Sequence, residues 1–390
     1  MLQIPINCTG CYSCVNICPT DCITMEQVGT GFFTPKINRS ECINCDQCKK
    51  GCPVLHMPQM STKTTAYAIK NRSEEIRIES TSGGMFSLLA KYVLERKGVV
   101  FGAAYNSDFS VQHIAVSDWE KISLLRGAKY AQSIIGTCLL EVKKELLSGR
   151  MVLFSGTPCQ CAGLRAFLGK RYDNLITVDM ICHGIPSPKV WQAYIDYRSK
   201  MENGGKRPFR INMRSKSSGW SHYRYTTEFD YGEGKISRIQ SSQDLFMKAF
   251  IGNICLNSAC SDCMMKGIER CTDFTLGDYW GIWNQYPKFD DNKGTSVVFV
   301  HTQKGRKILN QIQSQMDYLN VNIKETYQEN RSLIDSSGMH ADREEFLMCV
   351  TSNNFEVLIN QYCSERQKKQ LGVLRRVHKK VIKFFNRRYR

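Results

Sequence analysis

Two cysteine motifs near the start of the chain have the spacing that binds iron–sulfur clusters. Each motif places three cysteines three residues apart and a fourth cysteine four residues later, directly before a proline. The motifs are Cys8, Cys11, Cys14 and Cys18, and Cys42, Cys45, Cys48 and Cys52. In such pairs, three close thiolates hold one cluster and the fourth thiolate ligates the other cluster. The sequence therefore predicts two 4Fe–4S clusters, which carry single electrons.

The predicted ligands cross over between the two motifs. We expect Cys8, Cys11, Cys14 and Cys52 on one cluster, and Cys42, Cys45, Cys48 and Cys18 on the other. Zinc is the alternative, because four thiolates also suit a tetrahedral metal. Zinc sites do not require the third spacing and the trailing proline, so the repeated pattern favours iron–sulfur. Cys22 lies outside both motifs and is expected to be a small buried side chain.

Four cysteines further along the chain form a second group of candidate ligands. Cys260 and Cys263 form a C-x-x-C pair, which in a reducing compartment is a metal half-site or a redox pair. Cys159 and Cys182 each follow a predicted strand, and together the four thiolates would suit a third 4Fe–4S cluster. The alternative is that Cys159 and Cys182 are buried small residues and that the pair belongs to a loop.

The segments around these cysteines alternate between strand and helix patterns. Strands are expected at 66–70, 99–104, 151–154 and 174–181, and helices at 86–94, 135–147 and 158–168. This order predicts an α/β core with a partly parallel sheet. Antiparallel strands are expected within 206–236, and helices at 303–318 and 344–362.

Polar residues occupy the turns that open helices or follow predicted strands. Ser82-Gly83-Gly84 opens a helix, where backbone N–H groups suit a phosphate. Thr157 can cap the helix that follows Gly156, and Asp179 and His183 lie at the end of the next strand. Ligands of α/β proteins bind at the carboxyl ends of parallel strands, so these turns are expected to border a cleft. The plain alternatives are a common turn for Ser-Gly-Gly and a turn-capping role for His183.

Five motifs occur in a fixed order along the core. They are Ser82-Gly83-Gly84-x-Phe86, Leu125-Arg126-Gly127-Ala128-Lys129-Tyr130, Gly156-Thr157-Pro158-Cys159-Gln160, Cys182-His183-Gly184-x-Pro186-Ser187-Pro188 and Gly277-Asp278-Tyr279-Trp280-Gly281. Together they resemble the coenzyme F420 hydrogenase/dehydrogenase beta-subunit family, from about residue 66 to about residue 301. A dicluster ferredoxin domain is a common N-terminal attachment in that family. The resemblance implies a core that binds FAD and exchanges a hydride with a deazaflavin or a related carrier.

The resemblance also implies roles for individual residues. Flavin phosphate would be held by Ser82, Gly83 and Gly84, and the flavin ring would lie near Lys129 and Tyr130. The same cleft would be lined by Thr157, Asp179, His183 and Asp278. Lys129, His183 and Asp278 are the candidate catalytic residues, with Lys129 able to stabilise negative charge on a reduced ring. Ala128 stands where the family often has serine, which puts one flavin hydrogen bond in doubt.

Composition and charge define the setting. The chain has 390 residues, 42% hydrophobic and 23% charged, as in globular proteins of more than one domain. We expect a ferredoxin-type domain at 1–58, the two parts of the family core at 66–150 and 151–330, and a basic tail at 365–390. The N-terminal sequence lacks the pattern of a signal peptide, and clusters need thiolates, so a cytoplasmic location is expected.

From Arg366 to Arg390 the tail holds eleven of the Lys and Arg residues behind the net charge of +17, and no acidic residue. Its apolar residues recur at helical intervals, which predicts a basic amphipathic helix. Such a helix can contact an anionic membrane from the cytoplasmic side or pack on its own protein, and both interpretations stay open. No recognised motif accompanies the charge, so nucleic acid is not an expected partner.

These observations predict an iron–sulfur flavoprotein oxidoreductase. It would pass electrons between a hydride carrier and a one-electron protein partner, either a ferredoxin-like protein or a partner oxidoreductase. The alternative is an electron-relay subunit with no substrate of its own, serving a partner enzyme of surface-polysaccharide synthesis. That pathway is suggested by resemblance to a bacterial branch of the family often found beside polysaccharide genes. A third interpretation is a scaffold or binding protein that keeps its clusters for stability.

Overall fold

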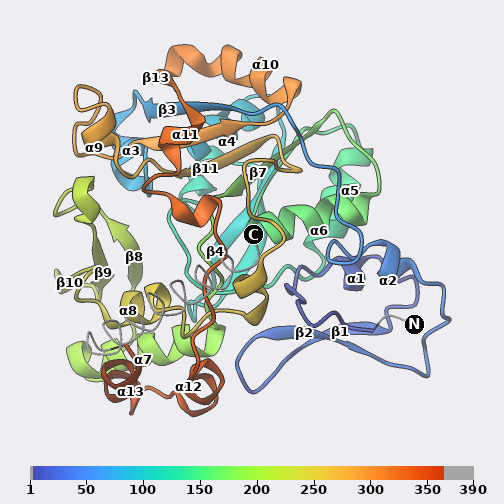
Figure 1. Cartoon of the computed structure of the whole chain (residues 1–390), viewed down its shortest axis with the longest axis horizontal. Coiled ribbons are helices and arrows are strands. Elements are labelled where there is room, and N and C mark those ends of the chain that lie inside the picture. The colour runs from blue at the N-terminus through green and yellow to red at the C-terminus, as the bar shows by residue number, and fades with distance from the viewer. Residues whose placement is uncertain (1–2, 364–390) are drawn as a thin grey trace, which may run out of the picture.

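An eight-stranded sheet forms the centre of the protein (Figure 1). The structure is a computed structural model that describes residues 3–363. The strands are β3 (Thr65–Asn71), β4 (Val99–Tyr105), β5 (Val111–Val116), β6 (Val152–Ser155), β7 (Leu175–Met180), β11 (Phe274–Asp278), β12 (Ser296–Val300) and β13 (Met316–Val321). Their order is β13-β3-β12-β11-β7-β6-β4-β5. The four strands from β11 to β4 are parallel and the outer pairs are antiparallel, which confirms the predicted α/β fold with a partly parallel sheet.

Helices cover both faces of this sheet because its central strands are apolar on both sides. Helices α4 (Met85–Leu94) and α10 (Gln303–Ile312) pack on one face, against residues such as Val100 and Leu153. Helices α5 (Cys138–Leu147) and α6 (Pro158–Leu168) pack on the other face, against Phe101 and Phe154. The alternation along each strand sends successive side chains to opposite faces.

The N-terminal domain is small and lies against α6 and the loops beside it. It contains the hairpin of β1 (Ile23–Gln27) and β2 (Phe33–Ile37) with the short helices α1 (Ser13–Asn16) and α2 (Gln47–Lys50). Hydrogen bonds fix it to the core: the Asn16 amide donates to the Gly136 carbonyl, and the Phe33 N–H donates to Gln132. The Ser187 hydroxyl donates to the Thr30 carbonyl at the hairpin turn. The domain is therefore held in one position by contacts along its length.

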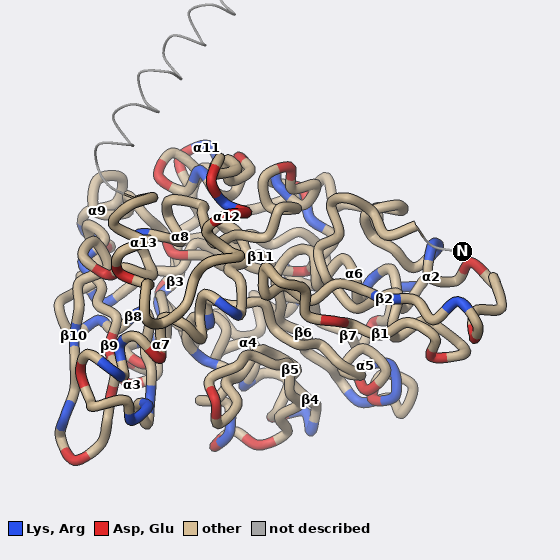
Figure 2. Tube along the Cα trace, turned by 90° about the horizontal axis from the view of Figure 1, so that it is seen from below, with Lys and Arg blue, Asp and Glu red and all other residues tan. Residues whose placement is uncertain are grey.

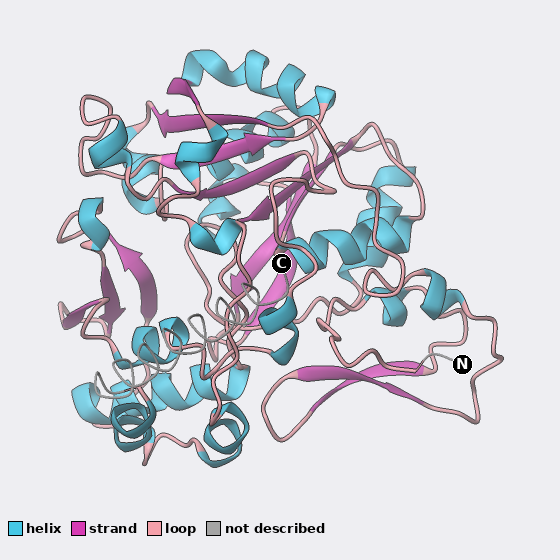
Figure 3. Cartoon of the chain, viewed as in Figure 1, coloured by secondary structure: helices cyan, strands magenta, loops and turns pink. Residues whose placement is uncertain are grey.

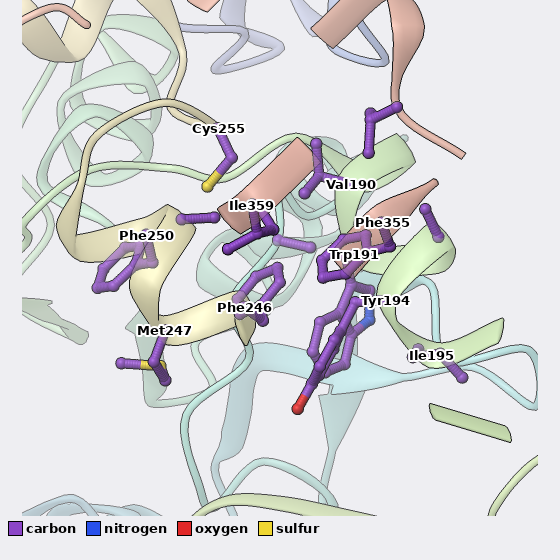
Figure 4. Close-up of a cluster of buried hydrophobic side chains, with 14 of the residues drawn as sticks. Val190, Trp191, Tyr194, Ile195, Phe246, Met247, Phe250, Cys255, Phe355 and Ile359 are labelled. Carbon is purple, nitrogen blue, oxygen red and sulfur yellow. The ribbon is translucent and has the colours of Figure 1, made fainter. Parts of the chain in front are cut away.

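A second layer of helices and strands lies beside the sheet (Figure 3). It comprises α7 (Pro188–Asn203), β8 (Arg210–Ser215), β9 (Thr226–Asp230), β10 (Ile236–Gln240), α8 (Leu245–Ile251), α12 (Arg343–Cys349) and α13 (Phe355–Tyr362). Aromatic rings from α7, α8 and α13 meet in its core, with Trp191 edge-on to Phe246 (Figure 4). The Trp191 Nε1–H donates to the Phe109 carbonyl, which satisfies the ring's polar group.

The remaining elements are short. They are α3 (Glu74–Glu79), α9 (Ile282–Gln285) and α11 (Ile323–Thr326), and the 3-10 helices Trp119–Leu124, Ser221–Tyr223, Ser258–Asp262, Gln313–Gln315 and Arg331–Leu333. Basic and acidic residues are interspersed along the chain in Figure 2. Within residues 3–363, no helix combines the length and apolar character needed to cross a membrane. The predicted basic tail at 365–390 lies outside the described residues, so its amphipathic helix stays a prediction.

Two helix predictions are wrong in their extent. The helix expected at 303–318 ends at Ile312, and the chain then forms β13 beside β3. Met316 and Val321 are buried in that strand, so pairing with the free edge of β3 overrides the helical pattern. The helix expected at 344–362 divides into α12 and α13, because Val350 is extended and the Asn354 side chain accepts the Thr351 N–H.

Candidate functional site

The eight N-terminal cysteines surround two separate cavities. One cavity is lined by Cys8, Cys11, Cys14 and Cys52, and the other by Cys18, Cys42, Cys45 and Cys48. This is the crossed grouping expected from the motifs, and four thiols around each space fit a 4Fe–4S cluster. Within residues 3–363, no group of three or more His, Cys, Asp or Glu side chains is arranged to hold a single metal ion; a 4Fe–4S cluster is a different kind of site, because each cysteine binds a separate iron. Cys22 is buried as expected, and its Sγ lies 3.4 Å from Cys18 Sγ.

The second group of cysteines meets at a third cavity, lined by Cys159, Cys182, Cys260 and Cys263. Cys159 lies in the first turn of α6, which a capping box fixes through Thr157 and Gln160. Cys182 follows β7, the strand parallel to β6, so the sheet brings both thiols to one edge. Burial raises the pKa of Cys159 to about 12, so this thiol stays protonated at neutral pH unless a cation replaces its proton.

Two basic residues also line the third cavity. They are Lys266 and Arg270, and the Lys266 ammonium donates to the Cys182 and Ser332 carbonyls. Their positive charge would offset the negative charge of ligating thiolates. Four thiols with two nearby cations fit an iron–sulfur cluster better than the alternative, in which the cysteines are only small buried side chains.

A larger cleft of about 510 Å³ lies between the carboxyl edge of the parallel strands and the second layer. Its volume is in the usual range for a cofactor or substrate pocket. The predicted residues on its wall are Ser82, Gly84, Lys129, Tyr130, Thr157, Asp179, His183 and Asp278. Gly83 does not line the cleft. A Cβ at Gly83 would lie 2.1 Å from the Ile69 carbonyl oxygen, so this glycine allows close packing against β3.

The N-terminus of α4 forms one end of the cleft. The Ser82 hydroxyl donates to the Thr295 carbonyl and the Gly83 N–H donates to the Ser296 hydroxyl, so both groups are used within the protein. A phosphate at this end would therefore meet the N–H groups of the first turn of α4. Lys216 stands beside it, with its ammonium bonded to the Arg77 and Ser82 carbonyls. Burial and the Arg77 charge lower the pKa of Lys216 to about 7.

Lys129 lies on the cleft wall with its ammonium fixed by backbone. It donates to the Leu124 carbonyl at 2.9 Å and to the Arg126 carbonyl at 2.6 Å. Burial lowers the pKa of Lys129 to about 7, so its charge is present below neutral pH and lost above it. Tyr130 follows it, with its ring edge-on to Phe250 at 4.9 Å.

An ion pair spans the cleft between β8 and β11. Arg214 Nη2 lies 2.7 Å from Asp278 Oδ2, and the guanidinium stacks over Tyr225 at 3.9 Å. Burial opposes the charge of Arg214, but the Asp278 charge, together with the nearby tyrosines, outweighs it and the pKa of Arg214 is raised, so the guanidinium keeps its charge. Trp220, six residues after Arg214, does not line the cleft; it is fully buried and stacks on Trp280.

Several buried polar atoms on the cleft wall have no hydrogen-bond partner within the described residues. They are Gln132 Nε2, Asp179 Oδ2, Arg214 Nε and Asp278 Oδ1. Buried donors and acceptors are rarely left unpaired in folded proteins, so these atoms indicate a polar ligand. A planar ring with N–H and carbonyl edges, joined to phosphate, fits both these atoms and the end of the cleft at α4. The residues present therefore fit a flavin nucleotide.

His183 lies between the cleft and the third cavity and lines both. Its Nε2 is 2.7 Å from Asn253 Oδ1 and its Nδ1 is 3.2 Å from the Ser332 hydroxyl. Both ring nitrogens are thus occupied, and burial lowers the pKa of His183 below its usual value. This geometry holds the ring in place and leaves no free nitrogen facing the cleft.

Sequence reasoning missed several polar residues at the site. Gln132, on the cleft wall, and Arg270, in the third cavity, carry no motif and reach these places only through the sheet and its loops. Thr9, between the cluster cysteines Cys8 and Cys11, was also missed. It lines three spaces: the cleft, the third cavity and the cavity that contains Cys8. Its position inside a short ligand loop is the one signal that was available.

Comparisons with known proteins give two family matches. Residues 149–325 match the family described as coenzyme F420 hydrogenase/dehydrogenase, C terminus of the beta subunit. Residues 7–55 match the 4Fe-4S dicluster domain. A curated relative, a polyferredoxin-like protein of Methanocaldococcus jannaschii described as uncharacterized, is 38% identical over 56 residues; the match covers 12% of this chain and 33% of that protein.

Among solved structures, a chain of the F420-reducing NiFe hydrogenase complex from Methanosarcina barkeri is similar with a TM-score of 0.46 and 17% identity. The match covers 76% of this chain and 91% of that chain.

Proposed function

Because the chain joins a 4Fe-4S dicluster domain to a domain of the coenzyme F420 hydrogenase/dehydrogenase beta-subunit family, we propose that it is an iron–sulfur flavoprotein oxidoreductase. It would transfer electrons between a hydride carrier in the cleft and a one-electron protein partner at the N-terminal domain. The carrier would be a deazaflavin or a related donor. FAD and a third 4Fe–4S cluster belong to this proposal.

The observation that carries the proposal is the adjacency of the four cavities. Cys159 and Cys182 line both the cleft and the third cavity, and Thr9 joins these two to the Cys8 cavity. The second N-terminal cavity shares no lining residue with the first, but Cys14 of the first lies near enough to Cys48 of the second for their charges to interact. A flavin supplies the exchange of a hydride for single electrons, and the clusters carry those electrons one at a time. A cleft beside a series of cavities lined by thiols suits this combination of hydride exchange in one place and single-electron transfer in others.

The residues of the chain supply binding and charge. The first turn of α4 would hold phosphate, and Lys129 would place positive charge near the ring below its pKa of about 7. The buried Arg214–Asp278 pair would present a donor and an acceptor to the ring or to the carrier. His183, held by Asn253, would keep the wall between the cleft and the third cavity in place.

The test is an anaerobic purification with an optical spectrum, identification of the extracted cofactor and an iron count. We expect flavin and about twelve irons per chain, with about eight after Cys260→Ser. Protein that contains iron but no flavin would contradict the enzyme and support the relay subunit. A count of about eight in the unaltered protein would remove the third cluster. Reduction by deazaflavin or nicotinamide donors, alone and with candidate partners, would identify the carrier.

A further inference from the structure

A continuous chain of hydrogen bonds runs from the cleft to the linker that follows the N-terminal domain. The Thr275 hydroxyl donates to Asp179 Oδ1 in a short hydrogen bond, and Thr275 Oγ1 lies 2.8 Å from His301 Nε2. His301 Nδ1 in turn lies 3.0 Å from Thr64 Oγ1. Asp179 lines the cleft, whereas Thr64 is half-buried beside the exposed Lys63. The two ends therefore meet different environments.

The direction of each bond follows from the donors available. A hydroxyl has one proton, and the Thr275 proton goes to Asp179 because an ionised carboxylate can only accept. His301 Nε2 must then carry the proton that bonds to Thr275 Oγ1, which leaves Nδ1 as an acceptor for the Thr64 hydroxyl. The Ile268 carbonyl also lies within reach of that hydroxyl, at 3.5 Å, but His301 Nδ1 is closer, at 3.0 Å. This assignment makes every bond point toward Asp179, as a chain that conducts protons inward requires.

Charged groups around the chain set its protonation. Asp179 faces the Arg270 guanidinium at 3.7 Å and the thiols of Cys161 and Cys271, while His301 faces Arg270, Asp273 and Arg306. Burial raises the pKa of Asp179 to about 6, although Arg270 and Thr275 oppose the rise. Burial, with a smaller contribution from Arg270, lowers the pKa of His301 to about 3. Asp179 thus exchanges protons near neutral pH, and His301 stays neutral.

We propose that Asp179, Thr275, His301 and Thr64 form a proton relay between the cleft and solvent. The inference rests on the proposed function. A hydride amounts to one proton and two electrons, and the clusters accept only the electrons. Each hydride that enters the cleft and leaves as single electrons therefore releases one proton, and the reverse reaction takes up one. This chain of bonds offers that proton a route from the cleft wall to the half-buried Thr64.

Each transfer along the relay is balanced. Inward, the Thr275 proton moves to Asp179, the Nε2 proton of His301 moves to Thr275, and the Thr64 proton moves to His301 Nδ1. A water molecule then restores the Thr64 proton. One proton has moved from solvent to Asp179, His301 has changed tautomer, and no charge remains between the ends. The same transfers in reverse order carry a proton outward.

The surroundings of Asp179 support this role. Its Oδ2 accepts no hydrogen bond within the described residues, and the Arg270 guanidinium faces it at 3.7 Å, which is too long for a hydrogen bond. Its Oδ1 is connected to the relay through Thr275. Because Asp179 also lines the cleft, one carboxylate borders the cleft and joins the relay.

The test follows protonation of Asp179 directly, by time-resolved infrared after a pH jump from pH 8 to pH 5 in the full-length protein. The carboxyl band is assigned by its loss in Asp179→Asn. Thr275→Val removes the hydroxyl with little change in shape and is expected to slow protonation about 100-fold, as for loss of one positioned proton-transfer group. Thr275→Ser keeps the hydroxyl and is expected to stay within about threefold of the unaltered rate.

Protonation in Thr275→Val at the unaltered rate would overturn the relay. Thr64→Val and Thr64→Ser repeat the comparison at the half-buried outer end, and they decide the question if Thr275→Val does not fold. Because the band belongs to Asp179 itself, the measurement does not depend on a bound cofactor. Purified protein without flavin but with a Thr275-dependent rate would contradict the proposed function alone. Flavin-containing protein with an unaffected rate would contradict the relay alone.

Discussion

The N-terminal domain and the core hold their reactive groups in opposite ways. Among residues 3–55, few hydrophobic side chains are buried: Tyr12, Cys22, Ile23 and Phe32. The cavities between them are lined by thiols. The core instead has extended apolar clusters on both faces of its sheet and in its second layer. A domain with so little apolar core needs inorganic groups to fold, whereas the core can bury charged side chains at the cleft.

The largest effect is expected where a cluster ligand is removed. Cys11→Ser should prevent one cluster from binding, and the N-terminal domain should then lose its fold, because metal binding supplies its folding free energy. Iron counting and limited proteolysis would measure this, with cleavage restricted to residues before the sheet. Cys349→Ser changes an exposed cysteine that lines none of these cavities and is the matched control. An intact, protease-resistant domain in Cys11→Ser would show that the clusters are not needed for folding.

A substitution in the core should lower stability without changing the iron content. Trp191→Ala removes a fully buried ring and is expected to lower the free energy of unfolding by about 3–5 kcal/mol. The iron content per folded chain should not change. Denaturant unfolding followed by circular dichroism would measure the loss, and Trp191→Phe should retain most of the stability. Loss of iron from the folded Trp191→Ala protein would show that the two regions are coupled in stability.

Gly163 tests the contact between the two regions. A Cβ at this position of α6 would lie 2.9 Å from Cys11 Sγ, so the glycine lets the ligand loop approach the helix. In an open helix, glycine to alanine would stabilise by about 1 kcal/mol. Here we expect Gly163→Ala to destabilise by about 1–3 kcal/mol, as overpacking does, and to shift the reduction potential of the Cys11 cluster. Denaturation and an electrochemical titration would measure both, and a gain in stability would contradict the close contact.

The smallest effect concerns charge at the cleft. Lys129 is protonated below its pKa of about 7 and neutral above it, so an anion should bind more tightly at pH 6 than at pH 8. A partly exposed charge contributes up to about 1 kcal/mol, roughly a fivefold change in dissociation constant. Calorimetry with FAD, whose diphosphate keeps its charge between pH 6 and pH 8, would measure this. Lys129→Met should bind weakly with less dependence on pH, and an unchanged dependence would show that another group titrates.

The sequence predicted the two regions unequally, for a physical reason. Cluster ligands lie within short loops, so their spacing is set by covalent geometry and the grouping of Cys8 with Cys52 followed from the motif. The sheet was predictable in outline, because buried parallel strands are apolar runs. The antiparallel strand β13 at the edge of the sheet was not predictable, because the chain is extended there only through its pairing with β3.

The cleft depends on contacts between residues distant in the sequence. Arg214 and Asp278 form their ion pair across 64 positions, and Thr275 joins Asp179 across 96. No local sequence pattern indicates such pairs. Gly83 also shows that a glycine in a motif typical of phosphate binding can instead allow two segments of backbone to pack closely. The resemblance to a family predicted residues that line the cleft. The hydrogen bonds behind these residues could be identified only in the structure.

The position of β3 has a consequence for biosynthesis. This strand is the first in the sheet by sequence, yet both of its neighbours, β12 and β13, come from much later in the chain. During translation the two edges of β3 therefore remain unpaired until β12 and β13 have been synthesised. The short-range ligand loops of the N-terminal domain face no such delay. Cluster insertion into the nascent N-terminal domain can therefore finish before the sheet of the core has closed.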